Sequence, residues 1–235
     1  MTNNILIAIV SFLPSIILGL LIWLRDPKKE PIQWLIKGFL IGCVLCFAVI
    51  YIEKGINFLL SGYEVNSSLL QIVTNAFLVA AIPEEMVKLL GLWFLLRKNP
   101  FFDEHIDGIV YAVFIGIGFA AIENILYLSR DNNWIFTAIV RSLLAVPGHY
   151  VFAVLMGFYY SLYHFVNHSK KNALYIIMVP VIVHGIYDTI AMSGIINQYV
   201  GLVCFFVLIV FCIYIHKKAQ KRIKILINKD INATK

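Results

Sequence analysis

Seven apolar runs, each close to the length of a membrane-spanning helix, occupy most of this 235-residue chain. A helix needs about 20 mostly apolar residues to cross the hydrocarbon core of a bilayer. Hydrophobic residues make up 61% of the chain, whereas soluble domains are about 45–50% apolar and could not bury so much apolar surface. The sequence therefore predicts an all-α, polytopic transmembrane bundle, a single domain over residues 1–216. Its expected spans are 5–24, 34–52, 72–96, 108–128, 134–165, 174–194 and 201–215.

Lysine and arginine residues are unequally divided between the two ends of these spans. Fourteen of them follow the first, third, fifth and seventh spans, and only Lys54 and Arg130 lie in loops on the other side. Because short cytoplasmic loops carry an excess of these residues, this distribution predicts an N-terminus outside and a C-terminus in the cytoplasm. The net charge of +6 is accordingly interpreted as a topology signal, and no nucleic-acid partner is expected.

Several boundaries stay open at this level. The first run lacks the basic start and small-residue cleavage site of a signal peptide, so we expect a retained helix. Residues 53–71 are polar and fit an external loop or an interfacial segment. The run 134–165 fits one kinked helix or two helices, with the kink at Pro147. The basic cytoplasmic tail, 217–235, is either an amphipathic helix on the membrane surface or a solvated segment.

Ionisable side chains inside the expected spans are the second unusual feature. Each one costs at least about 2.5–3.5 kcal/mol at the centre of a bilayer, so such residues usually face the bundle interior and mark a functional site. Residues four apart share a helix face, which places Glu84 beside Lys88 and His184 beside Asp188. The predicted topology puts the whole set between the midplane and the outer surface. Its members are Glu84, Glu85, Lys88, Glu123, His149, His184 and Asp188.

Two kinds of hydrolytic chemistry fit this set. Histidines together with carboxylates suit zinc, and a catalytic zinc leaves one position open for water; the tentative ligands are His149, His184, Asp188 and Glu123. The other possibility needs no metal, because a buried glutamate assisted by a histidine can activate water. The residues do not decide between them. The chain has no G-x-S-x-G or H-E-x-x-H sequence, which excludes two common hydrolase signatures.

Three motifs in order resemble the PrsW family of bacterial intramembrane proteases. They are Glu84-Glu85-x-x-Lys88, Phe119-x-x-x-Glu123 followed by Asn124, and His184-x-x-x-Asp188, with Pro147-Gly148-His149 between the last two. That family is distantly similar to the CAAX prenyl endopeptidases, so the resemblance implies a CAAX-protease-like core in a bacterial plasma membrane.

The resemblance also implies an activity and roles for individual residues. The implied activity is site-1 cleavage of a membrane-anchored anti-sigma factor, or of another single-span protein, which leads to activation of a sigma factor in a stress response. The catalytic candidates are Glu84, Glu85 and His184 first, then Glu123, His149 and Asp188; Lys88, Phe119 and Asn124 have supporting roles.

Two other classes of function stay open from the residues. Buried Glu, His and Asp side chains also form the relays of proton- or cation-coupled transporters. Such transporters favour paired broken helices in two halves, and one clear break, near Pro83, is visible here. A membrane binding protein without catalysis is the third possibility. Zinc dependence, oligomeric state and the route by which substrate enters are not fixed by the sequence.

Overall fold

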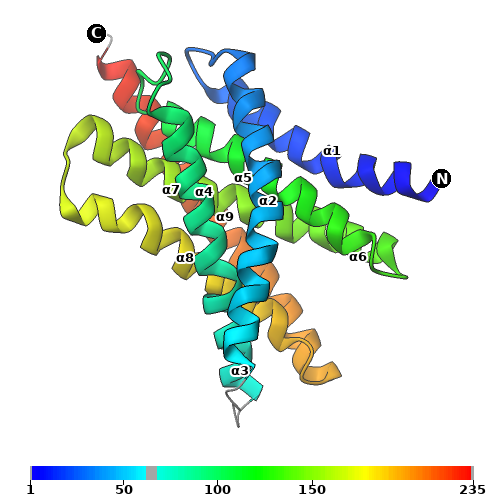
Figure 1. The fold of residues 1–235 in the computed structure, drawn as a ribbon. Helices are drawn as coiled ribbons and strands as arrows, with labels where there is room; N and C mark the ends of the chain where they lie inside the picture. Colours follow the sequence, from blue (N-terminus) through cyan, green and yellow to red (C-terminus); the bar gives the residue numbers. More distant parts are fainter. Residues whose placement is uncertain (1, 62–67, 234–235) are drawn as a thin grey trace.

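A computed structural model describes residues 2–61 and 68–233, and throughout those residues the regular structure is helical (Figure 1). The predicted all-α polytopic bundle is therefore confirmed. The elements in chain order are α1 (Thr2–Arg25), α2 (Ile32–Leu60), α3 (Ser68–Thr74), η1 (Asn75–Ala81), α4 (Ile82–Leu96), α5 (Asp107–Leu128), α6 (Trp134–Val140), η2 (Arg141–Ala145), α7 (Val146–Ser161), η3 (Leu162–Val166), α8 (Lys170–Ser193) and α9 (Gln198–Ala233), where η marks a π-helical stretch.

Among the described residues, six helices are long and apolar enough to cross a membrane. They are α1, α2, α5, the continuous helix α6–η2–α7–η3, α8 and α9. The remaining expected span, 72–96, corresponds to the continuous helical segment α3–η1–α4, whose hydropathy is lowered by Glu84, Glu85 and Lys88. Large apolar side chains such as Leu40 and Phe206 are exposed on the outside of the bundle, as expected of surfaces that face lipid.

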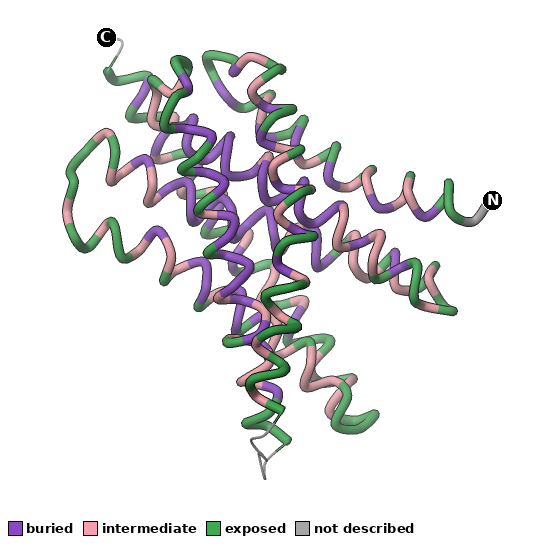
Figure 2. Tube along the Cα trace, in the orientation of Figure 1, coloured by how far each residue is buried: buried purple, intermediate pink, exposed green. Residues whose placement is uncertain are grey.

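Helix α5 is the central element of the bundle. It packs against α1, α2 and α7, and Figure 2 shows the buried residues gathered around it while the outer helices expose most of their surface. Glycines allow the closest of these contacts. A Cβ on Gly42 of α2 would lie 2.0 Å from the carbonyl oxygen of Ile115, and one on Gly118 of α5 would lie 2.1 Å from that of Phe39. Small residues at such crossings let membrane helices pack backbone to backbone.

Two prolines shape the helices that carry the polar residues. Pro83 is the second residue after η1, and Pro147 is the second residue after η2. Each π-helical stretch ends with an i→i−5 hydrogen bond, from Ile82 N–H to the Phe77 carbonyl and from Val146 N–H to the Arg141 carbonyl. Proline cannot donate a helical hydrogen bond, and the wider π turn accommodates this loss. The run 134–165 is thus one helix with an irregular turn, and its expected kink region coincides with that turn.

The basic loops lie at one end of the bundle. Lys28 Nζ in the α1–α2 loop is 2.5 Å from Asp103 Oδ2 in the α4–α5 loop, and His105 Nδ1 is 2.6 Å from Asp230 Oδ1 near the end of α9. The α1–α2 loop, the α4–α5 loop and the C-terminal part of α9 are therefore in contact. The charge distribution assigned all three to the same side of the membrane.

Two helices extend beyond the predicted limits. Helix α2 continues to Leu60, so residues 53–60 are helical rather than loop, while residues 62–67 of the expected loop lie outside the described part. Helix α9 continues through most of the basic tail to Ala233. Ala219, Ile223 and Leu226 on this extension are buried in the main hydrophobic core. The tail is a packed helix because its apolar residues recur at helical spacing and meet the bundle instead of a membrane surface.

Candidate active site

The first turns of α4 carry the two glutamates into the bundle. Glu84 and Glu85 directly follow Pro83, and Lys88 lies one turn further along. Lys88 Nζ donates to Glu84 Oε2 at 2.9 Å and to Glu85 Oε1 at 2.8 Å, and all three side chains are buried. The ammonium also lies 4.1 Å from the centre of the Phe119 ring, a favourable cation–π position. One lysine thus offsets the cost of burying two carboxylates.

Helix α8 brings a histidine to the same point. His184 Nδ1 lies 2.9 Å from Glu85 Oε1, and His184 Nε2 lies 3.2 Å from Asp188 Oδ2, one turn along the same helix. The ring of Phe152 stacks on His184 with centroids 4.5 Å apart. The imidazole is therefore held on both edges and on one face, which restricts its rotation and favours a single orientation.

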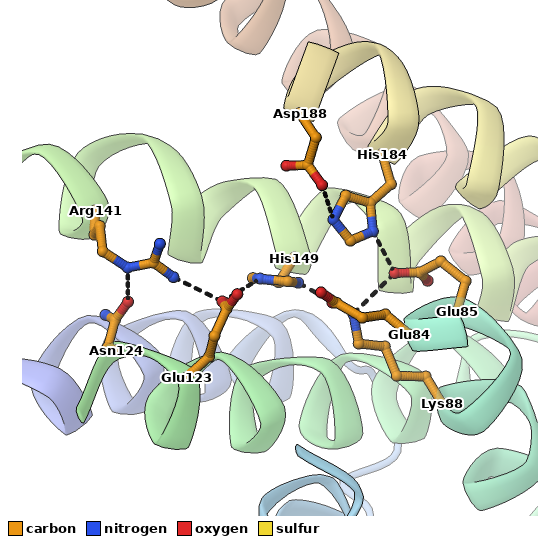
Figure 3. A network of polar contacts seen from close by, with 9 residues as sticks. All are labelled: Glu84, Glu85, Lys88, Glu123, Asn124, Arg141, His149, His184 and Asp188. Atoms are coloured by element: carbon orange, nitrogen blue, oxygen red, sulfur yellow. Dashed lines mark hydrogen bonds and ion pairs between the residues drawn. The ribbon is translucent and has the colours of Figure 1, made fainter. Parts of the chain in front are cut away.

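A second histidine links this group to α5. His149 lies on α7 just beyond Pro147, with Nδ1 3.2 Å from Lys88 Nζ and Nε2 2.9 Å from Glu123 Oε2. Arg141 ends this chain of contacts, because its guanidinium donates to both Glu123 Oε2 and Asn124 Oδ1 at 2.7 Å. Figure 3 shows that side chains from α4, α5, the continuous helix containing η2 and α7, and α8 form one continuous polar network.

A cavity of about 730 Å³ opens onto this network. Glu84, Glu123, His149, His184 and Asp188 line it, together with Arg141. The fully buried Glu85 is not part of its wall. The lining also includes Lys54, Asn57 and Arg130, which belong to the ends of α2 and α5 that point away from the basic loops. Polar groups that converge on a cavity of this size are typical of a ligand or substrate site.

One part of the network has the spacing of a metal site. Glu84, Glu85 and His184 each offer a ligand atom, and these atoms lie within 4.8 Å of one another. Glu85 Oε2 is buried and has no hydrogen-bond partner among the described residues. Two carboxylates and an imidazole are donors that zinc accepts, so this group fits a metal ion. This group differs from the tentative ligand set given by the sequence, which included His149 and Glu123. In the structure these two residues are hydrogen-bonded to each other and do not belong to the group.

The structure joins all the residues singled out from the sequence. Glu84, Glu85, Lys88, Glu123, Asn124, His149, His184 and Asp188 form the network, and Phe119 covers Lys88. Arg141 was not among those residues, but it binds Glu123 and Asn124; the signal that could have identified it is a cation inside an expected span. Phe152 carried no signal that distinguishes it from an ordinary core residue.

Comparison with known proteins agrees with this geometry. Residues 30–215 match the family described as "PrsW family intramembrane metalloprotease". The chain is 36% identical over 178 residues to Protease PrsW of Clostridioides difficile, covering 72% of this chain and 73% of that protein. It is 35% identical to Protease PrsW of Geobacillus kaustophilus, covering 77% of each chain. It is 34% identical to Protease PrsW of Bacillus subtilis, covering 75% of this chain and 78% of that protein.

No solved structure matches the chain. The family match spans most of the chain and every member of the polar network. It identifies the chain as a membrane protease, in place of the transporter and the non-catalytic binding protein considered from the sequence. This protein belongs to the PrsW family of intramembrane metalloproteases.

Proposed function

We propose that this protease hydrolyses a peptide bond of a single-span membrane protein at the Glu84–Glu85–His184 group. The observation that carries the proposal is the convergence of one ligand atom from each of these three side chains within 4.8 Å, with Glu84 and His184 at the wall of a cavity and Glu85 buried behind them. Peptide hydrolysis needs an activated water and stabilisation of the charge that develops on the carbonyl oxygen. This group offers oxygen and nitrogen donors for the first task, and Arg141 in the same cavity wall supplies positive charge.

The group also fits the metal that the family description implies. Glu84, Glu85 and His184 would hold the ion, and zinc is the metal we propose because imidazole and carboxylate suit it. A bound zinc supplies a Lewis acid and a water of lowered pKa. With its proton on Nε2, His184 would donate to Asp188 and keep the lone pair of Nδ1 for the ion, while Lys88 would hold the two glutamates and His149 would hold Glu123.

One observation favours a second mechanism at the same residues. The Lys88 ammonium already bridges both glutamates, so a positive group of the protein itself lies between the carboxylates. In this version Glu84, the glutamate that lines the cavity, takes the proton from the attacking water, and Glu85 and His184 keep it oriented. Activity that survives exhaustive chelation selects this version, whereas loss on chelation and recovery with about one zinc per chain selects the metal version.

The substrate we propose is a membrane-anchored anti-sigma factor, cut at its first site on the external side of a bacterial plasma membrane. The cavity wall reaches Asn57 and Arg130, at the end of the bundle away from the basic loops. The charge distribution assigns that end to the outside. A single-span protein can approach the cavity laterally from the bilayer, which fits a site enclosed by membrane helices.

The test is cleavage of single-span candidate substrates by the purified protein in proteoliposomes. Glu85→Ala and His184→Ala are expected to abolish cleavage, and His164→Ala is the matched control because His164 lies near the opposite end of the bundle. Undiminished cleavage by both site variants would contradict the assignment. Cleavage of other single-span proteins but not of an anti-sigma factor would remove only the substrate proposal.

A further inference from the structure

A second group of carboxylates lies at the other end of the bundle, apart from the active site. Asp26 in the α1–α2 loop, Glu104 in the α4–α5 loop and Asp107 at the start of α5 each offer an oxygen, and these oxygens lie within 4.8 Å of one another. Asp107 precedes Glu123 by sixteen residues on α5, which separates the two groups by roughly 24 Å along the helix. The carboxylates therefore belong to a separate location.

Each loop holds its own carboxylate in a fixed position. The two oxygens of Asp26 accept the backbone N–H groups of Lys28 and Glu30 at 3.1 and 3.2 Å. One oxygen of Asp107, Oδ2, accepts the backbone N–H groups of Asp103 and Glu104 at 3.0 and 2.6 Å. These bonds order both loops around the side chains that face one another, so the oxygens are arranged before any ligand arrives.

Two buried oxygens of this group accept no hydrogen bond from an N–H or O–H group of the described residues. Asp107 is fully buried, yet its Oδ1 accepts no hydrogen bond from the described residues, and the same is true of the buried Oε2 of Glu104. A buried carboxylate oxygen without a partner costs several kcal/mol. Groups of this kind usually mark an ion or a water that belongs to the site.

The surrounding charges do not balance the carboxylates. Lys28 is paired with the exposed Asp103, and the Lys29 ammonium donates to the backbone carbonyls of Leu24 and Asp26. Glu30, whose carboxylate accepts from the Tyr111 hydroxyl, adds a further negative group next to Asp107. Among the described residues, this end of the bundle therefore gathers more carboxyl groups than side-chain cations that pair with them.

We propose that Asp26, Glu104 and Asp107 bind a hard divalent cation, Mg²⁺ or Ca²⁺, that joins the α1–α2 loop to the α4–α5 loop. The ligand set consists of oxygens alone, which selects these ions over zinc. The bound ion satisfies the two free oxygens and offsets the charge of the carboxylates. Its role is structural, because it ties α1 and α2 to the start of the central helix α5.

Terbium(III) luminescence tests this site in the full chain in detergent or nanodiscs. Terbium occupies oxygen sites for hard cations, and nearby aromatic rings sensitise it. Two such rings are close: Tyr111, bonded to the Glu30 carboxylate, and Trp23, whose Nε1 donates to the Glu30 carbonyl at 3.3 Å. We expect saturable luminescence that Mg²⁺ and Ca²⁺ displace and that Na⁺ at equal ionic strength does not. The ion that displaces terbium at the lower concentration identifies the preferred occupant.

Glu104→Gln is the diagnostic variant, because Glu104 is only partly buried and its replacement keeps the side-chain volume. It is expected to weaken terbium binding by about tenfold or more, while Asp131→Asn, which changes a carboxylate in the loop between α5 and α6, leaves binding unchanged. Glu104→Gln retains Glu84 and Glu85. Any luminescence from terbium bound at the active site therefore persists in this variant and can be subtracted from the wild-type luminescence.

Thermal unfolding provides a second measurement. If Glu104 only made structural contacts, Glu104→Gln would be less stable than the wild type in chelator, whereas the proposal predicts equal or greater stability. In chelator, Glu104→Gln is expected to be as stable as the wild type or more stable, because it removes repulsion. Addition of Mg²⁺ or Ca²⁺ should then raise Tm only in the wild type and Asp131→Asn. The proposal is overturned if neither cation changes the wild-type Tm, if Glu104→Gln binds terbium as the wild type does, or if it is less stable than the wild type in chelator.

Discussion

Glu85 and His184 are 99 positions apart in the chain, and their side chains meet at 2.9 Å inside the bundle. The contact exists only when α4 and α8 pack together, so the group proposed for catalysis forms only as the bundle folds. Glu85 has no exposed surface. Its position is therefore set by Lys88 and His184 and not by solvent.

Asp188→Asn is expected to lower kcat about 10- to 100-fold with little change in KM. Asp188 Oδ2 lies 3.2 Å from His184 Nε2, and an amide accepts a proton less well than a carboxylate and can turn its N–H₂ toward the ring. His184 then loses the partner that fixes its tautomer. Steady-state kinetics with a single-span substrate measure the effects on kcat and KM separately. A raised KM with unchanged kcat would show that Asp188 binds substrate instead.

Arg141→Lys and Arg141→Gln should differ from each other. The guanidinium donates from Nε to Asn124 and from a terminal nitrogen to Glu123, and a lysine ammonium cannot reproduce this planar fork. We expect Arg141→Gln to lower the free energy of unfolding by about 1–3 kcal/mol, because it removes a partly buried partner of Glu123. Arg141→Lys should lose about half as much. Equal stability of both variants and the wild type in chemical unfolding would contradict the role assigned to this pair.

The sequence predicted the polar site well because the bilayer makes each buried charge expensive. Seven ionisable residues within apolar runs had few physical explanations other than a shared interior site, and the structure joins all seven. The partners within one helix, such as Glu84 with Lys88 and His184 with Asp188, also followed from spacing of four residues. Pairs between helices did not, because sequence spacing carries no information about which helices are neighbours.

The parts that sequence reasoning missed depend on tertiary packing. Leu226 at the end of α9 is apolar in a basic segment, and only its contact with the core distinguishes a packed helix from a surface helix. The metal-compatible grouping of Glu84 with Glu85 and His184, rather than His149 with Glu123, depends on side-chain direction at the turn after η1. Hydrophobic periodicity gives neither of these.

Gly118→Val is expected to disrupt the α2–α5 crossing. A Cβ at this position would meet the Phe39 carbonyl oxygen at 2.1 Å, and backbone cannot move aside as a side chain can. Overpacking typically costs about 1–3 kcal/mol, and a helix–helix crossing without free space should lie at the upper end. Gly55→Val is the matched control on α2, because no other described residue lies within 4 Å of a Cβ at this position. Similar Tm losses in the two variants would show that helix propensity or glycine entropy, and not the crossing, causes the effect.

Lys88→Met separates the two mechanisms proposed for the active site. Lys88 is the cation that bridges Glu84 and Glu85, and methionine retains most of its volume but leaves both carboxylates without a positive partner. In chelator, the variant should lose about 3–5 kcal/mol of stability. If Glu84, Glu85 and His184 hold zinc, added Zn²⁺ replaces the missing charge and raises the Tm of Lys88→Met more than that of the wild type.

A double variant makes this measurement specific. In Lys88→Met combined with Glu84→Gln, one of the three proposed ligands is missing, so the rescue by Zn²⁺ should disappear while the loss of stability in chelator becomes smaller. The loss shrinks because a neutral amide is less costly to bury than an unpaired carboxylate. Zinc rescue that persists in the double variant would place the ion elsewhere in the bundle. No zinc effect in the single variant, together with cleavage that survives chelation, would leave Glu84 as the group that activates water.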